Sequence, residues 1–279
     1  MLQRTDRVCL AVPDAGKAAE DFAAIFDTLI VDVSLDKITN AVRTTLQWGQ
    51  DQVELFEPQG DGPVADFLDG GHSGLFAGGF ASADPEAVAA RLQERGVTVH
   101  QQSTARFMVL PGELNGTGVV LTKTQEHDRI GLNDKIWQIT YAVPDIKAAV
   151  ANYSLLFGLE ETFTNYYTSD NFGYEGAITW FDARVGGMLD SLEYLEPNDD
   201  SMAVARFVRR NGNGIYMASV ETDDIPAIKQ RVTSTGNGWQ GTDFGGFIHP
   251  KRLHGLLLGL VTYESWNVRR PLPDQTNER

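Results

Sequence analysis

Residues 54–58 of the chain are Glu-Leu-Phe-Glu-Pro, and residues 193–197 are Glu-Tyr-Leu-Glu-Pro. A second motif, Ala-Val-Pro-Asp, occupies residues 11–14 and recurs at residues 142–145. Further matching segments follow in the same order, at offsets between 131 and 140 residues. Four or five identical residues can match by chance, but several ordered matches at one spacing indicate an internal duplication. The sequence therefore predicts two tandem copies of one domain.

Each copy divides again into two smaller units. An apolar, strand-like run ends in an aspartate, and a helical stretch follows, so that Asp14, Asp84, Asp145 and Asp224 are predicted to cap four helices. Three shorter strand-like runs, separated by Gly, Asn and Asp, follow each helix. The pattern predicts an α+β fold of four βαβββ units, which pair into two domains.

The predicted domains span residues 1–126 and residues 134–268. A polar stretch between them has the composition of a linker. Residues 269–279 are polar and contain proline, and we expect them to form a tail.

The composition narrows the class of partner. A formal net charge of −15 disfavours nucleic acid and anionic membranes, because both are bound through clustered Lys and Arg. The single cysteine, Cys9, excludes an intrachain disulfide. No signal peptide or membrane-spanning stretch is recognisable. We therefore expect a cytoplasmic protein, monomeric or homodimeric, whose partner is a small organic substrate or ligand.

Two stretches of the second copy, residues 193–224 and residues 247–260, carry a family resemblance. They resemble the glyoxalase, bleomycin-resistance and methylmalonyl-CoA epimerase proteins of the vicinal oxygen chelate superfamily, and the first copy resembles the same pattern more loosely. The resemblance implies that each pair of units curls into a half-open barrel. It also implies a divalent ion, held by three or four His, Glu or Gln side chains, that chelates two neighbouring oxygens of the substrate.

Most of the implied ligand positions hold residues that cannot bind such an ion. Arginine is always cationic, alanine and glycine offer no donor, and a thioether is unsuited to hard cations. We therefore predict no cofactor, and keep a divalent metal with unusual ligands such as Glu193 and His249 as an alternative. The implied positions are Arg7, Glu54, Ala77 and Thr122 in the first copy and Gln138, Glu193, Met217 and Gly259 in the second.

In the first copy, the resemblance places Arg7 and Glu54 inside one barrel. A buried carboxylate without a metal must pair with a cation or take up a proton. One interpretation is an ion pair that fills a retired site. The other is an arginine that binds a substrate carboxylate.

In the second copy, Glu193 has no equivalent cation. A carboxylate among aromatic residues should have a raised pKa, which suits a general base. We expect Glu193 to be this base, with Gln138, Tyr216 and His249 as hydrogen-bonding or acid partners. The alternatives are a solvated Glu193 without a catalytic role and a His249 that only packs at the start of a strand. Substrate contacts are expected from Trp180, Met217 and Tyr167, and from Arg7 and Glu54 in the first copy.

Three hypotheses about function follow. The first is an enzyme of lyase or isomerase type that transfers a proton at Glu193. The second is a metal-free protein, similar to the bleomycin-resistance branch, that sequesters a ligand between aromatic walls. The third keeps the metal chemistry of the superfamily.

Overall fold

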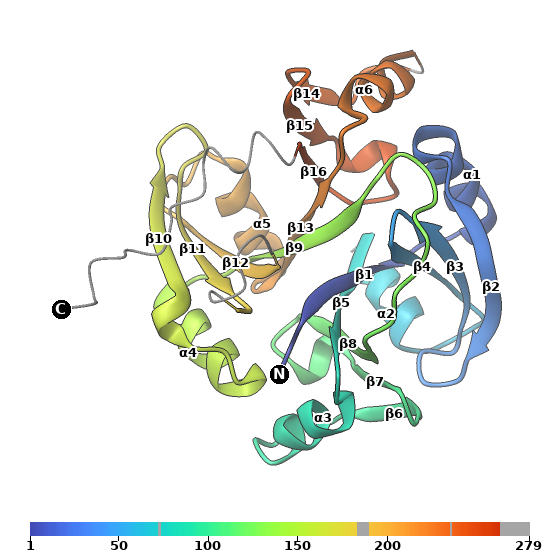
Figure 1. Cartoon of the computed structure of the whole chain (residues 1–279). Coiled ribbons are helices and arrows are strands. Elements are labelled where there is room, and N and C mark those ends of the chain that lie inside the picture. The colour runs from blue at the N-terminus through green and yellow to red at the C-terminus, as the bar shows by residue number, and fades with distance from the viewer. Residues whose placement is uncertain (72–73, 183–189, 235, 263–279) are drawn as a thin grey trace.

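The chain folds around two mixed sheets of eight strands each. The computed structural model describes residues 1–71, 74–182, 190–234 and 236–262. The first sheet has the strand order β2-β3-β4-β1-β5-β8-β7-β6, and the second repeats it as β10-β11-β12-β9-β13-β16-β15-β14. Figure 1 shows the two halves side by side, with β1 and β9 crossing the middle of the molecule. The strands of the first half are β1 Arg4–Ala11, β2 Leu29–Asp36, β3 Ala41–Trp48, β4 Asp51–Pro58, β5 Gly74–Ser82, β6 His100–Ser103, β7 Arg106–Val109 and β8 Gly118–Lys123.

The second half repeats this series from its first strand to its last. Its strands are β9 Lys135–Ala142, β10 Thr164–Ser169, β11 Tyr174–Trp180, β12 Ser191–Pro197, β13 Gly214–Glu221, β14 Trp239–Gly241, β15 Gly245–Ile248 and β16 Leu258–Val261. In each half the two βαβββ units join where their first strands, β1 with β5 and β9 with β13, pair antiparallel. Each of these four strands also pairs parallel with the last strand of its own unit. The predicted α+β fold of four βαβββ units in two half-open barrels is confirmed.

The long helices begin where the sequence places them. They are α1 Ala15–Phe26, α3 Pro85–Gln93, α4 Ile146–Phe157 and α6 Ile225–Ser234. The carboxylates of Asp14, Asp84 and Asp145 each accept a hydrogen bond from the backbone N–H three residues later, at 2.8 to 3.0 Å. This bond satisfies a donor that the first helical turn leaves free. The fourth aspartate, Asp224, instead holds Arg129 of the linker with its carboxylate, at 3.0 Å.

Two short helices follow the Glu-x-x-Glu-Pro motifs. They are α2 Pro63–Asp69 and α5 Ala203–Asn211. Three 3₁₀ turns complete the described elements, η1 Pro111–Glu113, η2 Glu161–Phe163 and η3 Pro250–Arg252. Helix α5 and turns η1 and η3 border the cavity described below.

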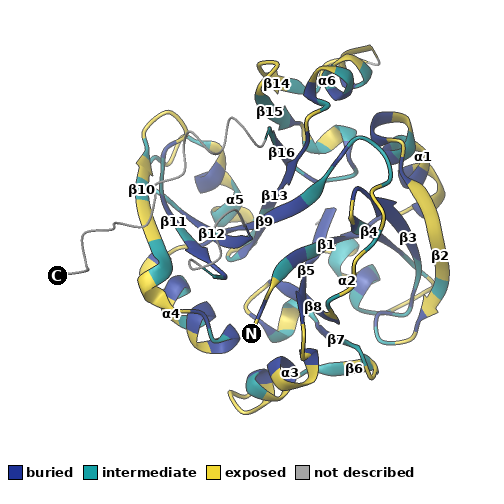
Figure 2. Ribbon diagram, in the orientation of Figure 1, coloured by how far each residue is buried: buried dark blue, intermediate teal, exposed yellow. Residues whose placement is uncertain are grey.

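One hydrophobic core runs through both halves. Phe80 of the first sheet contacts Phe157 and Phe181 of the second half, with ring centroids 6.0 and 5.8 Å apart. Figure 2 shows buried strands in the centre and exposed residues along the outer strands and helices. Because apolar surface is removed from water across the junction, the halves stabilise one another by the hydrophobic effect.

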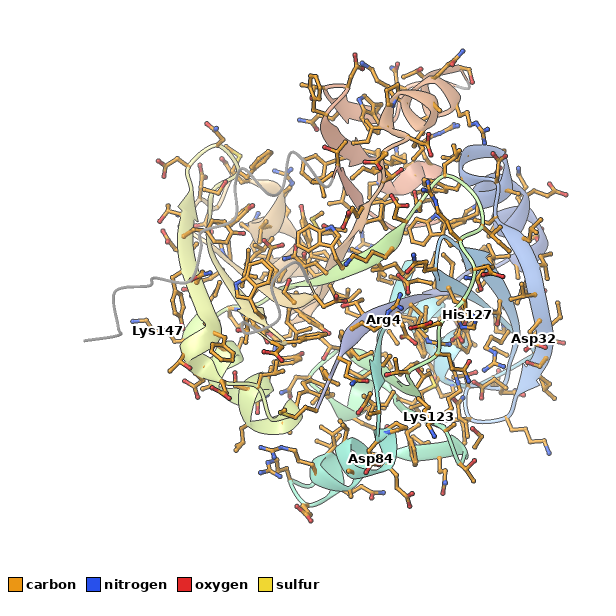
Figure 3. All side chains as sticks on the ribbon, in the orientation of Figure 1. Arg4, Asp32, Asp84, Lys123, His127 and Lys147 are labelled. Atoms are coloured by element: carbon orange, nitrogen blue, oxygen red, sulfur yellow. The ribbon has the colours of Figure 1, made fainter. Side chains whose placement is uncertain are left out.

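The backbones of the two halves approach each other closely. A Cβ atom added to Gly74 would lie 2.4 Å from the carbonyl carbon of Gly255, so no larger residue fits between these backbones. The carboxylate of Asp51 bonds to Arg4 and to the backbone N–H of Ile136. Figure 3 shows Arg4 near the centre of the molecule, whereas Asp32, Asp84 and Lys147 lie at its periphery.

The predicted linker contacts the first half of the chain. Linker residue Ile130 forms an isolated antiparallel bridge with Gly49, so this segment packs against the first half. The predicted tail, residues 269–279, lies outside the described residues. Within the described part of the chain, every helix is too short or too polar to cross a membrane.

Candidate functional site

The barrel of the first half holds the predicted pair of Arg7 and Glu54. Arg7 lies on β1 and Glu54 on the adjacent strand β4. The guanidinium of Arg7 donates to the carboxylate of Glu54 over 2.7 Å, and both residues are buried. Arg7 also contacts Asp6, at 2.8 Å. The pair supports the interpretation as an ion pair that fills the barrel.

A second arginine, Arg106 on β7, completes this cluster. Its two terminal nitrogens donate to the two oxygens of Glu54, at 2.8 and 2.6 Å. Burial opposes the charge of Glu54, but Arg106 and Arg7 outweigh it and hold the pKa of this carboxyl well below its usual range. Arg106 was not among the predicted site residues. Its alternation with the buried Met108, two residues along the same strand, was the available indication that it faces inward.

The remaining positions of the first barrel do not supply metal ligands. Ala77 packs in an apolar cluster with Cys9. The hydroxyl of Thr122 donates to Asp6 over 2.6 Å. Glu54 is fully engaged by two guanidinium groups, which a divalent cation would have to displace against charge repulsion. The residues present therefore do not fit a divalent ion.

The barrel of the second half holds Glu193 in different surroundings. Glu193 lies on β12 and is half-buried. Its carboxylate accepts one hydrogen bond from the hydroxyl of Thr140, at 2.6 Å, and one from Tyr167, at 2.5 Å. Desolvation raises the pKa of Glu193, and the two hydrogen bonds lower it only in part.

Neighbouring groups of this barrel are also poor metal ligands. The amide of Gln138 donates to the hydroxyl of Ser191 over 3.1 Å and makes no hydrogen bond to Glu193 among the described contacts. The methyl group of Met217 would lie 2.9 Å from a Cβ atom added at Gly259, so the side chain of Met217 packs directly against this glycine. Nowhere in the described ranges do three or more His, Cys, Asp or Glu side chains gather closely enough to hold a metal ion. The donors of this barrel do not fit a divalent ion either.

The other predicted site residues separate into two groups. Tyr216, Met217 and His249 line one cavity. Trp180 lies outside that lining and packs against Trp137 in a separate cluster. Tyr167, predicted as a substrate contact, donates its hydroxyl to Glu193.

The cavity that Tyr216 lines has a volume of about 780 Å³ and opens between the two halves. Aromatic and aliphatic side chains form most of its wall, as in pockets for small organic molecules. The first half contributes part of this wall through α2 and η1, which the sequence did not indicate. A smaller and more polar cavity, of about 230 Å³, adjoins Arg7 and Arg106 in the first half. The wall of the larger cavity includes Phe67, Leu75, Pro111, Phe172, Tyr174, Phe207, Tyr216, Met217, Phe247 and His249.

Glu193 is not part of the cavity wall but is linked to it by two tyrosines. The hydroxyl of Tyr167 reaches Glu193, and the ring of Tyr167 meets the ring of Tyr174 edge-on at 6.2 Å. Tyr174 in turn lines the cavity. The carboxylate therefore lies one tyrosine layer behind the wall.

Comparison with known proteins agrees with this architecture. The fold is similar to a mutant of 4-hydroxymandelate synthase from Streptomyces coelicolor, with a TM-score of 0.66 over 94% of this chain and 93% of that one, at 13% identity. Residues 137–243 match the model of the Glyoxalase/Bleomycin resistance protein/Dioxygenase superfamily. The second half of the chain therefore matches a family model of vicinal oxygen chelate proteins, and the whole chain is similar in fold to the synthase.

About half of the chain also aligns with smaller proteins. A methylmalonyl-CoA epimerase in complex with methylmalonyl-CoA and NH4+ is 26% identical over 47% of this chain and 94% of its own, with a TM-score of 0.41. The epimerase from Mycobacterium tuberculosis is 24% identical over 47% of this chain and 89% of its own, with a TM-score of 0.39. Among curated proteins, no sequence matches this chain.

Proposed function

We propose that the second half is a metal-independent enzyme of lyase or isomerase type, in which Glu193 takes up and returns a proton of a small organic substrate. The observation that supports this proposal is the contrast between the two equivalent glutamates. Two arginines neutralise Glu54, whereas the described partners of Glu193 are two hydroxyl groups. A carboxylate with a raised pKa and no paired cation is a stronger base near neutral pH.

Tyr174, on the cavity wall, and Tyr167 behind it are the groups through which Glu193 would reach the substrate. As the substrate gives a proton to the hydroxyl oxygen of Tyr174, the proton of Tyr174 passes to the hydroxyl oxygen of Tyr167, and the proton of Tyr167 passes to Oε1 of Glu193, over 2.5 Å. Protonation neutralises the carboxylate and leaves negative charge on the substrate. Tyr216 and His249, on the cavity wall, are the groups that could stabilise that charge or return a proton. Gln138, through Ser191, would support the strand that carries Glu193.

Sequestration of a ligand is the second candidate. It is favoured by the position of Glu193 outside the lining of the cavity and by the aromatic wall between them. A protein that only binds its ligand needs such a wall and no base.

Hydrogen exchange in D2O tests the proposal and separates it from sequestration. The protein would be incubated with a panel of small carbonyl compounds, and deuterium uptake next to the carbonyl would be followed by NMR. We expect exchange of at least one compound, reduced about a hundredfold or more in Glu193→Gln and also reduced in Tyr167→Phe. Unchanged exchange in a folded Glu193→Gln variant would remove Glu193 as the base. Binding of a compound without any exchange would favour sequestration.

A further inference from the structure

One face of helix α5 borders the cavity for the full length of the helix. Ala203, Arg206, Phe207, Arg210 and Asn211 all line it, at spacings of three and four residues. This is the spacing of one helical face. The stripe therefore presents two cations, Arg206 and Arg210, beside the aromatic ring of Phe207.

Neither cation is neutralised by a carboxylate among the described ion pairs. Arg206 donates to the backbone oxygen of Ser201, and Arg210 donates to that of Gly71 over 2.6 Å. A carbonyl oxygen fixes the position of a guanidinium but leaves its charge and its other donors available. Both side chains are exposed at the cavity.

The cations are specific to the second half. At the repeat offset of this helix, the counterpart of Arg206 is Asp66 on α2, and the counterpart of Arg210 is Gly70. In a chain of net charge −15, two unpaired arginines beside an apolar cavity form a local site of opposite sign. Such a site attracts an anion, and the guanidinium fork suits carboxylate and phosphate groups.

Apolar and aromatic side chains also line the cavity. Phe172 and Phe247 meet edge-on, with centroids 6.3 Å apart, and Phe207 and Tyr216 meet in the same way at 5.3 Å. Phe67 and Leu75, from the first half, extend this wall. A flat apolar body would bury its surface here, while a charged end would stay at α5.

We propose that the cavity takes an amphipathic organic anion, with its carboxylate or phosphate group at Arg206 and Arg210 and an apolar, ring-bearing body between the halves. This inference rests on the proposed function in one respect, because it names the substrate class of the same site. The first half then belongs to the binding site through its wall.

A displacement assay with the full chain tests this proposal. The neutral fluorophore N-phenyl-1-naphthylamine serves as reporter, and three competitors share one naphthalene body. They are 1-naphthoate, 1-naphthyl phosphate and the neutral 1-naphthalenemethanol. We expect at least one anion to compete about tenfold or more tightly than the alcohol, and the preference to shrink at high salt. The ranking of the two anions identifies the charged group.

Variants of α5 locate the preference. In Arg206→Gln/Arg210→Gln, the anions should lose about tenfold in affinity and approach the alcohol, while the reporter binds as before. Arg209→Gln is the matched control, because Arg209 lies on the same helix outside the cavity wall and pairs with Asp200. Phe247→Ala should weaken the reporter and all competitors alike.

The outcomes separate this inference from the proposed function. An equal affinity for anions and alcohol, or an anion preference that survives in Arg206→Gln/Arg210→Gln, overturns the inference and leaves the chemistry of Glu193 untouched. Loss of deuterium exchange in Glu193→Gln, with anion binding intact in that variant, supports both. If anion binding depends on the arginines but the protein catalyses no deuterium exchange, the inference is supported and the proposed enzymatic activity is excluded.

Discussion

Asp51 and Asp190 occupy equivalent positions in the two halves, and each carboxylate accepts a hydrogen bond from the backbone of the opposite half. Asp51 accepts from the N–H of Ile136 at 2.6 Å, and Asp190 accepts from that of Thr5 at 2.7 Å. Both aspartates are almost fully buried. Desolvation outweighs the nearby cations and raises the pKa of Asp51 to about 7 and that of Asp190 to about 6.

The first prediction is that Asp51 makes stability depend on pH. Its folded pKa lies above the unfolded one, so its stabilising effect is fully present below pH ~4 and is lost as pH rises through about 7. From pH 4.5 to 8, the unfolding free energy of the wild type should fall relative to Asp51→Asn, on the order of 3 kcal/mol. Urea titrations at several pH values measure it.

The environment of Asp51 includes Arg4, which favours its charge, and Asp6 and Asp190, which oppose it. The exposed Asp69→Asn serves as control and should follow the wild type. If the difference in unfolding free energy between the wild type and Asp51→Asn does not change with pH, the pKa of Asp51 is not raised.

The second prediction concerns the buried cluster around Glu54. Arg106→Ala removes two of the hydrogen bonds to a carboxylate that stays buried, so we expect a loss of about 3–5 kcal/mol in unfolding free energy at pH 7. Chemical unfolding measures this loss. Arg95→Ala, at an exposed ion pair with Glu94, should change stability by less than about 1 kcal/mol. If Arg106→Ala loses as little unfolding free energy as Arg95→Ala, Arg106 is not required to stabilise the buried carboxylate of Glu54.

The third prediction concerns the contact between Gly74 and Gly255. Gly74→Ala should destabilise the protein by more than about 2 kcal/mol, because the new methyl group meets backbone atoms of the other half at 2.4 Å. Gly96→Ala is the matched control, since Gly96 also has a positive φ but nothing within 4 Å of an added Cβ atom. Thermal unfolding of both variants separates the contact from the backbone strain. Equal losses would exclude the contact as the cause.

The fourth prediction concerns the pKa of Glu193. A hydrogen bond to the charged form favours ionisation, so Thr140→Val should raise this pKa further, and Tyr167→Phe should raise it as well. Titration of the carboxyl ¹³C shift measures the pKa in each variant. Thr124→Val is the control, because the hydroxyl of Thr124 forms an exposed hydrogen bond to Gln3 in the first half. This variant should leave the pKa of Glu193 unchanged. A lowered pKa in Thr140→Val would contradict the role of this hydroxyl.

The fifth prediction concerns metal binding. Because Glu54 is held by arginines and the described partners of Glu193 are two hydroxyl groups, equilibrium dialysis against Mn²⁺ or Zn²⁺ should give much less than one ion per chain. Protein without a histidine tag is needed for the measurement. A stoichiometric ion that is lost in Glu193→Gln would restore the metal chemistry of the superfamily.

The fold was largely predictable because its determinants are local. An aspartate at the end of an apolar strand caps a helix whatever surrounds it, and Asp14, Asp84 and Asp145 do so. The internal repeat then predicted the same order of helices and strands in both halves. Asp224 was predicted as a cap on the same local grounds, but its carboxylate pairs with Arg129 of the linker, a contact that the local pattern does not indicate.

The site was predictable only in part because its contacts are distant in sequence. Arg106 lies 52 residues from Glu54, and Tyr167 lies 26 residues from Glu193. Strand alternation gives the face on which a side chain lies but not its partner across the barrel. The large cavity depends on how Phe67 and Pro111 of the first half meet α5, which is a matter of packing between halves.

The difference between Glu54 and Glu193 has a consequence for how such a molecule can diverge. In an assembly of two identical subunits, every substitution appears in both barrels at once. Here the two copies are joined in one polypeptide, so Arg106 can neutralise Glu54 while the described partners of the equivalent Glu193 are hydroxyl groups. One copy is then free to become scaffold and cavity wall, and the other can specialise without losing its neighbour.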